Sequence, residues 1–249
     1  MVYRIPAVNL VGRGCLAQLK DEIGTLGCKK ALVVSDKFLT ENGVVEKVTK
    51  VLDQVGIEHT LYNDVKQNPS VANVEGGLEV LKKENCDFIV SIGGGSPQDC
   101  GKAISVLATN GGKITDYEGV NKSQKKCLPI VAIATTAGTS AEVTINYVIT
   151  DEETHIKMIM VDRNTLASIT VNDPELMLSK PAGLTAATGM DALTHAIEGY
   201  TTKAAWEMTD MFHIKAIELI SDSLRGAVEN TPEGREGMAM GQYIAGMGF

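Results

Sequence analysis

The sequence lacks an excess of positive charge. Its 23 lysines and arginines stand against 31 aspartates and glutamates, which gives a formal net charge of −8. A nucleic acid or an anionic membrane surface would repel a chain with this charge. Both are therefore excluded as general partners, and the charge favours a function in small-molecule chemistry.

Closely spaced cysteines and long apolar runs are missing as well. No apolar run approaches the ~20 residues of a membrane span, and the N-terminus lacks a basic start followed by an apolar stretch. The cysteines are odd in number, widely spaced and without a CxxC pair, which argues against a disulfide framework and a zinc-cysteine site. We expect a cytoplasmic protein in a reducing environment. The five cysteines are Cys15, Cys28, Cys86, Cys100 and Cys127.

Short apolar, β-branched runs alternate with helix-period segments through the first two thirds of the chain. This alternation is typical of an α/β fold, and continuous apolarity within the runs indicates strands buried on both faces. The pattern predicts a parallel sheet covered by helices. Strands are expected within residues 30–36, 59–64, 87–95, 128–136 and 167–173, two further strands within 143–162, and helices within 41–56 and 71–85.

The pattern of residue types changes beyond Pro181. From there to the end, alanine, leucine, methionine and isoleucine recur at helical spacing, and no strand-like run follows. We therefore predict a Rossmann-like, parallel-sheet nucleotide domain over residues 1–180 and the start of an all-helical domain over residues 181–249.

A loop with three glycines lies at "SIGGGSPQDCGK", residues 91–102. Glycines let a diphosphate approach the backbone, Ser96 can cap the following helix, and Pro97 suits its first turn. The free N–H groups and the helix dipole attract an anion. The loop departs from the Rossmann fingerprint and from the P-loop, which disfavours ATP hydrolysis. A plain glycine turn between strand and helix is the alternative.

Two further features suit a dinucleotide. The loop "ATTAGTSAEVT", residues 134–144, offers hydroxyls and also follows a predicted strand, so both loops belong to the carboxyl edge of the sheet. Asp36 ends the strand "ALVVSD", where its carboxylate can accept hydrogen bonds from a ribose and would repel a 2′-phosphate. This favours NAD over NADP. Asp36 as a simple helix cap is the alternative.

"GMDALTHAIEGY" places Asp191 and His195 four residues apart in a predicted helix. Positions i and i+4 lie on one face, so both side chains can reach one metal ion. An ordinary surface pair is the alternative. The other histidines fit a metal site poorly, because His59 begins a strand, His155 lies in a polar turn, and His213 is expected to pack on the next helix.

In this order and spacing, "GGGSPQDCGK", "TTAGTSAEVT" and "GMDALTHAIEGY" resemble the iron-dependent (group III) alcohol dehydrogenases, from about residue 4 to the last residue. The resemblance implies a homodimer, with residues 2–12 near the contact, and a metal and a nicotinamide that meet between two domains. It also implies that one aspartate and three histidines hold the metal, of which Asp191 and His195 match the first two. The implied cofactor contacts are Asp36, Asn68, Gly94, Gly95, Ser96, Thr135, Thr136, Thr139, Val148 and Lys157.

The resemblance implies hydride transfer between NAD(H) and a small aldehyde, primary alcohol or 1,2-diol, with the metal as a Lewis acid. Ligands without a thiolate suit Fe(II), and the geometry also admits Zn(II). The family's two later histidines have no counterpart before Phe249, so we expect a chain truncated by about a third that binds NAD with little activity. The alternatives are a non-catalytic nucleotide-binding protein and a glycerol dehydrogenase or dehydroquinate synthase-like enzyme.

Overall fold

A six-stranded parallel sheet forms the centre of the computed structural model, which describes residues 2–249. The strand order is β1-β9-β6-β4-β2-β3, and each neighbouring pair is parallel. The predicted parallel sheet is thereby confirmed, whereas the short edge strand β1 was not predicted. The strands are β1 (Val8–Val11), β2 (Lys30–Val34), β3 (Glu58–Tyr62), β4 (Phe88–Gly93), β6 (Ile130–Ala134) and β9 (Ile169–Asn172).

Helices cover both faces of this sheet. Successive side chains along each strand point to opposite faces, and because the buried strands are apolar on both sides, both faces need a covering layer. Leu32 and Val34 of β2 belong to the core under α4 and α5, whereas Ala31 and Val33 belong to the core under α3. Short 3₁₀ helices span Cys15–Gln18, Ile23–Leu26, Ile114–Tyr117, Arg163–Thr165 and Pro174–Leu176. The α-helices of this part are α1 (Leu19–Glu22), α2 (Lys37–Glu41), α3 (Val44–Gln54), α4 (Val71–Glu84) and α5 (Gly95–Asn110).

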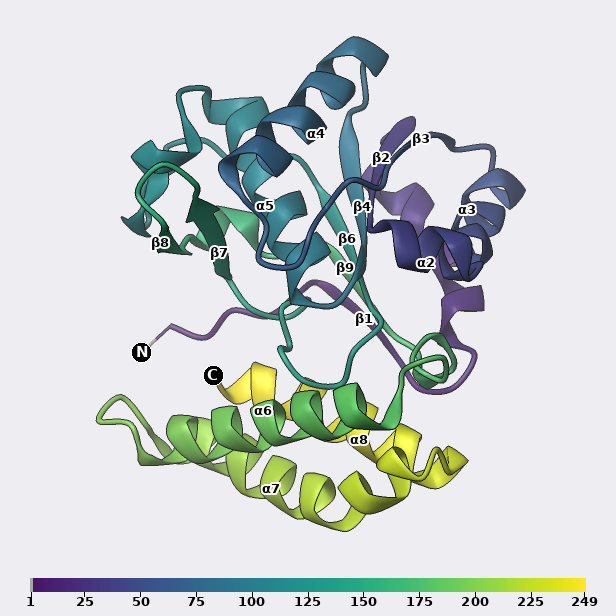
Figure 1. Ribbon diagram of the computed structural model, residues 1–249, viewed down its shortest axis with the longest axis vertical. Helices are drawn as coiled ribbons and strands as arrows, with labels where there is room; N and C mark the ends of the chain where they lie inside the picture. The colour runs from purple at the N-terminus through teal and green to yellow at the C-terminus, as the bar shows by residue number, and fades with distance from the viewer. Residues whose placement is uncertain (1) are drawn as a thin grey trace.

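A second, three-stranded sheet lies beside the main one (Figure 1). Its strands β7 (Asn146–Asp151) and β8 (Ile156–Val161) form an antiparallel hairpin, and β5 (Gly119–Val120) adds to β8. The hairpin confirms the two strands expected around the acidic turn within residues 143–162. It also extends the chain away from the main sheet directly after the threonine loop.

Three long helices form a separate layer below the main sheet in Figure 1. They are α6 (Ala182–Thr201), α7 (Glu207–Val228) and α8 (Pro232–Gly248), and their shared core consists largely of alanines. Small side chains let these helices approach closely. No helix within residues 2–249 has both the length and the apolar character that a membrane crossing needs.

Helix α8 joins the helical layer to the sheet through buried polar contacts. Asn172 of β9 donates to the carbonyl of Ala239 at 2.8 Å, and Ser140 donates to the carbonyl of Gln242 at 2.6 Å. Gln242 also donates to the Glu142 carboxylate at 2.7 Å. Buried polar groups must find partners, so these bonds fix how the two parts meet.

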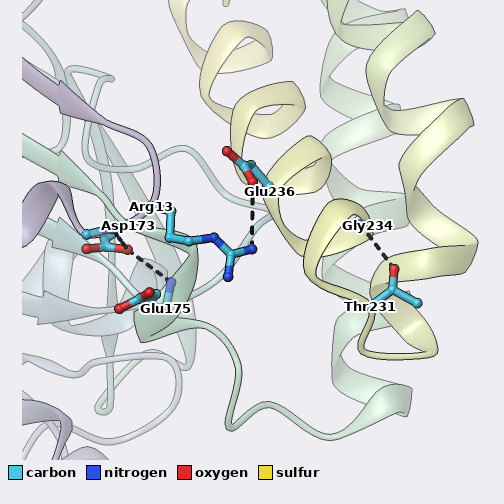
Figure 2. A network of polar contacts seen from close by, with 7 residues as sticks. Arg13, Asp173, Glu175, Thr231, Gly234 and Glu236 are labelled. Atoms are coloured by element: carbon cyan, nitrogen blue, oxygen red, sulfur yellow. Dashed lines mark hydrogen bonds and ion pairs between the residues drawn. The ribbon is translucent and has the colours of Figure 1, made fainter.

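Figure 2 shows the outer side of this junction. Arg13 lies 3.7 Å from Glu236 of α8, and both side chains are well exposed, so the ion pair adds little stability. Thr231 caps α8 by accepting a hydrogen bond from the Gly234 N–H at 3.1 Å. The orientation of the helical layer therefore depends on its buried contacts rather than on this surface pair.

Candidate cofactor and metal cleft

A cavity of about 700 Å³ lies between the α/β part and the helical layer. This volume is within the range of about 300–1,000 Å³ that is usual for ligand sites. The glycine loop, the threonine loop, the β7–β8 hairpin and α6 all contribute to its wall. The predicted site residues among those lining it are Asn68, Gly95, Thr139, Val148, Lys157, Asp191 and His195.

The glycine loop and the threonine loop are in direct contact. A Cβ added to Gly94 would lie 2.8 Å from Cγ2 of Thr136, and one added to Gly95 would lie 3.2 Å from Cγ2 of Thr139. A side chain at either glycine would therefore push the loops apart. Helix α5 begins at Gly95 with Gly94 as its N-cap, so the expectation that Ser96 caps this helix is wrong. The chain turns into the helix two residues earlier than the sequence suggested.

Five predicted cofactor contacts do not line the cavity itself. Gly94 and Ser96 belong to the start of α5, and Thr135 and Thr136 follow β6 directly. Thr135 is fully buried, and its hydroxyl has no hydrogen-bond partner among the described residues. Asp36 stands further away, at the end of β2. The structure thus separates the predicted contacts into a group at the cavity wall and a group around the loops behind it.

Asp36 acts as the N-cap of α2. Its Oδ1 accepts a hydrogen bond from the Leu39 N–H at 2.8 Å. Lys180, at the start of the helical layer, lies within electrostatic reach. Burial lowers the pKa of Lys180 to about 8, while the charge of Asp36 opposes this shift and the charge of Arg235 adds to it. The cap engages only Oδ1, and Oδ2 stays at the strand end, so capping and ribose binding are compatible.

Asn68 and Lys157 come together although 89 residues separate them. Lys157 Nζ donates to Asn68 Oδ1 at 2.9 Å, which links the loop before α4 to β8. Asn68 has a positive φ of 55°, a conformation that asparagine tolerates better than most residues. The resemblance alone suggested these two residues, and the structure brings both to the cavity wall.

Asp99 is a cavity residue that the sequence analysis did not select. Its carboxylate accepts a hydrogen bond from the Val148 N–H at 3.0 Å. Burial raises the pKa of Asp99 to about 7, although the charge of Lys102 and the Val148 N–H both act to lower it. Asp99 belongs to the motif "GGGSPQDCGK", one turn into α5, and helical spacing from Gly95 could have placed it beside the cavity.

Asp191 and His195 lie together on α6, as the i and i+4 spacing predicts. Asp191 Oδ1 is 3.9 Å from His195 Nε2, and both side chains are partly exposed at the cavity. The ring of Phe249 packs against His195 with a centroid distance of 5.2 Å. Within residues 2–249, no group of three or more histidines, cysteines, aspartates or glutamates is placed to hold a metal.

The remaining histidines lie elsewhere. His213 is fully buried in α7, next to Gly199 and Gly248, and neither ring nitrogen has a hydrogen-bond partner among the described residues. Burial lowers the pKa of His213. His59 belongs to the edge strand β3, where its Nδ1 lies 3.6 Å from Asp53 Oδ1. His155 occupies the turn between β7 and β8. None of the three lines the cavity.

Comparison with known proteins identifies relatives along the whole chain. The family described as "Iron-containing alcohol dehydrogenase" matches residues 6–174, and "Fe-containing alcohol dehydrogenase family, C-terminal" matches residues 185–249. Alcohol dehydrogenase 4 of Schizosaccharomyces pombe is 50% identical over an alignment that covers 99% of this chain and 59% of the relative. Lactaldehyde reductase of Escherichia coli K12 is 48% identical over 96% of this chain and 63% of the relative.

A solved structure shares the fold and carries a cofactor. Sulfoacetaldehyde reductase from Bifidobacterium kashiwanohense, in complex with NAD⁺, superimposes with a TM-score of 0.92 at 34% identity. The match covers 100% of this chain and 66% of that one. The predicted fold class and the resemblance to the iron-dependent alcohol dehydrogenases are confirmed. The chain spans about 60% of the length of the curated relatives that it matches.

Proposed function

This chain belongs to the iron-containing alcohol dehydrogenase family, and we propose that it takes part in hydride transfer between NAD(H) and a small aldehyde, primary alcohol or 1,2-diol. One observation carries the proposal: a single cavity brings Asp191 and His195 together with five of the predicted cofactor contacts. A hydride donor and a group that polarises a carbonyl must be held side by side for this reaction.

The loops fit a dinucleotide. Helix α5 is 16 residues long, has no acidic residue in its first turn, and begins at two glycines, which carry no side chain that could cover its first N–H groups. Such a helix start attracts a diphosphate. Asn68 and Lys157 offer polar groups at the opposite wall, and Asp36 favours NAD over NADP by repelling a 2′-phosphate. A relative of the same fold binds NAD⁺, which supports this choice of cofactor.

The donor set at α6 fits part of a metal site. A carboxylate oxygen and an imidazole nitrogen suit Fe(II) and also admit Zn(II). When bound, such an ion polarises the carbonyl of the aldehyde or stabilises the alkoxide of the alcohol. Asp191 and His195 would hold the ion at the cavity wall. Two protein ligands alone give weak affinity, so we expect weak metal binding and little turnover by residues 1–249.

The division of labour between the two parts belongs to the same proposal. Residues 1–180 would bind the dinucleotide, and residues 181–249 would supply the metal ligands. The intact enzyme would be a cytoplasmic homodimer. A non-catalytic nucleotide-binding protein is the second candidate, because the described residues place only two ligands at the cavity.

Direct binding measurements test the proposal. NADH fluorescence is expected to change on titration with the protein, and anaerobic calorimetry is expected to detect weak Fe(II) binding. Asp191→Asn and His195→Gln should each weaken Fe(II) binding at least tenfold and leave NADH binding within about twofold. Asp222→Asn, an exposed change on α7, is the matched control and should alter neither.

Two results would contradict the proposal. A protein that binds neither NADH nor NAD⁺ would exclude the cofactor assignment. Unchanged Fe(II) affinity in both ligand variants would exclude the metal assignment. Anaerobic oxidation of NADH by propanal or lactaldehyde with added Fe(II) then separates the two candidates, because only a dehydrogenase shows turnover, however slow, that the Asp191→Asn variant loses.

A further inference from the structure

Lys102 is a buried lysine for which the proposed reaction gives no role. Its side chain is 1% exposed, in the middle of α5, and it forms no ion pair within residues 2–249. Burial lowers the pKa of Lys102 to about 8, and the charges of Asp99 and Glu142 oppose this shift. A lysine is rarely so deeply buried unless its ammonium group has partners.

The partners of Lys102 are three backbone carbonyls. Its Nζ donates to the oxygens of Ala141 at 2.7 Å, Thr144 at 2.8 Å and Asn146 at 2.7 Å. An ammonium group has three donors, so all of its hydrogen-bonding capacity is directed at one short segment. Hydrogen bonds from a charged donor are stronger than those between neutral groups. Lys102 therefore holds residues 141–146 at three points.

Residues 139–148, which include these three carbonyls, form the wall of the cavity with the least regular secondary structure. Residues 139–148 supply seven of the sixteen residues that line the cavity, and the part before β7 contains neither helix nor strand. Backbone ladders thus fix only its end. Ser140, at the start, has a positive φ of 52°. The position of the wall therefore depends on side chains that reach it from neighbouring elements.

Helix α5 holds the segment at a fourth point. Asp99 lies one turn before Lys102 and accepts the Val148 N–H at 3.0 Å. Positions i and i+3 face the same side of a helix, so both residues act on the segment together. The same helix begins at Gly95 in the glycine loop. One rigid helix thereby links the position of the glycine loop to the position of residues 139–148.

We propose that Lys102 is a positioning residue whose ammonium group holds residues 139–148 as a wall of the cofactor cavity. It touches no cofactor itself, since it is enclosed behind the wall. This role rests on the proposed function in one respect, namely that the cavity binds NAD(H). Removing the ammonium group would leave three carbonyls without their donor, and the wall would lose its fixed position relative to the glycine loop.

Hydrogen exchange measured by mass spectrometry tests the role in the protein without cofactor. Lys102→Met keeps a long apolar side chain and removes the three donors, and we expect exchange within residues 139–148 to become at least tenfold faster while the amides of β2 and β4 stay protected. Lys102→Arg keeps charge and donors and should restore most of the protection. Lys83→Met, an exposed change on α4, is the matched control and should resemble the wild type.

NADH fluorescence gives the functional readout. We expect Lys102→Met to weaken NADH binding at least tenfold and to lower the fluorescence of the bound cofactor, with Lys102→Arg closer to the wild type. Unchanged exchange within residues 139–148 in a folded Lys102→Met protein would overturn the proposal. If no NADH binds to the wild type, the proposed function fails. The exchange experiment still shows whether Lys102 holds residues 139–148 in place.

If Lys102→Met does not fold, a measurement on the wild type tests the proposal instead. The ammonium group of Lys102 should give a nitrogen-15 NMR signal with slow solvent exchange, because its protons are enclosed and bonded, while Lys83 should not. This signal should shift when NADH saturates the protein. A Lys102 ammonium group that exchanges as fast as that of Lys83 would overturn the proposal.

Discussion

Asp36 shows how one side chain meets two requirements. Its Oδ1 caps α2 through the Leu39 N–H at 2.8 Å, and its charge stands at the end of β2, where the ribose of a dinucleotide is expected. A substitution by glycine would remove both the cap and the charge. A serine keeps a capping oxygen and removes only the charge.

We therefore predict that Asp36→Ser relaxes the preference for NAD(H) over NADP(H). The expected shift in selectivity is on the order of 1–3 kcal/mol, because the repulsion of the 2′-phosphate disappears. Lys180 would then attract the phosphate without opposition from Asp36. Titration of both reduced cofactors, followed by fluorescence, measures the effect, and equal affinities for NADH and NADPH in the wild type would exclude this role of Asp36.

We predict that cofactor binding depends on pH because of Asp99. Its pKa is raised to about 7, so the carboxyl is neutral below this pH and gains a negative charge at the cavity wall above it. For unit charges about 8 Å apart at an effective dielectric constant of about 40, each negative charge of a diphosphate is repelled by about 1 kcal/mol. NADH binding should therefore weaken at least about fivefold between pH 6 and pH 8.

Asp99→Asn is the control for this dependence. The amide oxygen still accepts the Val148 N–H, whereas no charge develops. Any other pH dependence is common to both proteins, so the difference between the two profiles belongs to Asp99. Parallel profiles for the wild type and the variant would contradict the prediction.

At the scale of elements, the docking of α8 depends on Arg235. Arg235 is 4% exposed, and its guanidinium group joins the start of α8 to the segment that leads into α6. Its bonds run from one side chain to four different acceptors, which fixes the beginning of α8, α6 and the loop after β9 together. The acceptors are Asn230 Oδ1, Thr185 Oγ1 and the carbonyls of Met177 and Lys180.

We predict that Arg235→Met lowers the free energy of unfolding by about 2–4 kcal/mol, because buried acceptors lose a charged donor. Arg225→Met, an exposed change on α7, should cost no more than about 0.5 kcal/mol. Urea denaturation measures both, with Trp206, the single tryptophan, reporting on the helical layer. Equal stabilities of the two variants would show that Arg235 does not hold α8 in place.

At the scale of the whole molecule, the free edge of the main sheet is relevant to assembly. Strand β1 pairs only with β9, and its other edge has no partner within residues 2–249. The segment before it runs to the helical layer, where Tyr3 stacks on Phe212 and donates to the carbonyl of Met247 at 2.9 Å. An unpaired, partly apolar edge is a surface on which a second copy can add.

We predict a homodimer with residues 2–12 at or near the contact. Light scattering should give twice the chain mass of 26.5 kDa at micromolar concentration. Exposed apolar side chains on α6 and α7, Met190, Ile197, Met211 and Ile214 among them, can also cause non-specific association. A dilution series separates a discrete dimer from larger aggregates, and a clean monomer would contradict the prediction.

The sequence by itself determined the local structure and the chemistry available to the protein. Apolar, β-branched runs such as "ALVV" specified buried strands, because each residue of the run finds a core on one face of the sheet or the other. The spacing of Asp191 and His195 specified a shared helix face, since the geometry of a helix is the same in any context. Three motifs in order were enough to identify the family.

Only the tertiary structure decided which of these residues meet. β1 escaped prediction because four residues with one asparagine carry little signal, and pairing with β9, 161 positions away, makes them a strand. The contact between Asn68 and Lys157 and the three bonds of Lys102 likewise join distant segments. Such contacts depend on how whole elements pack, and local spacing carries no information about them.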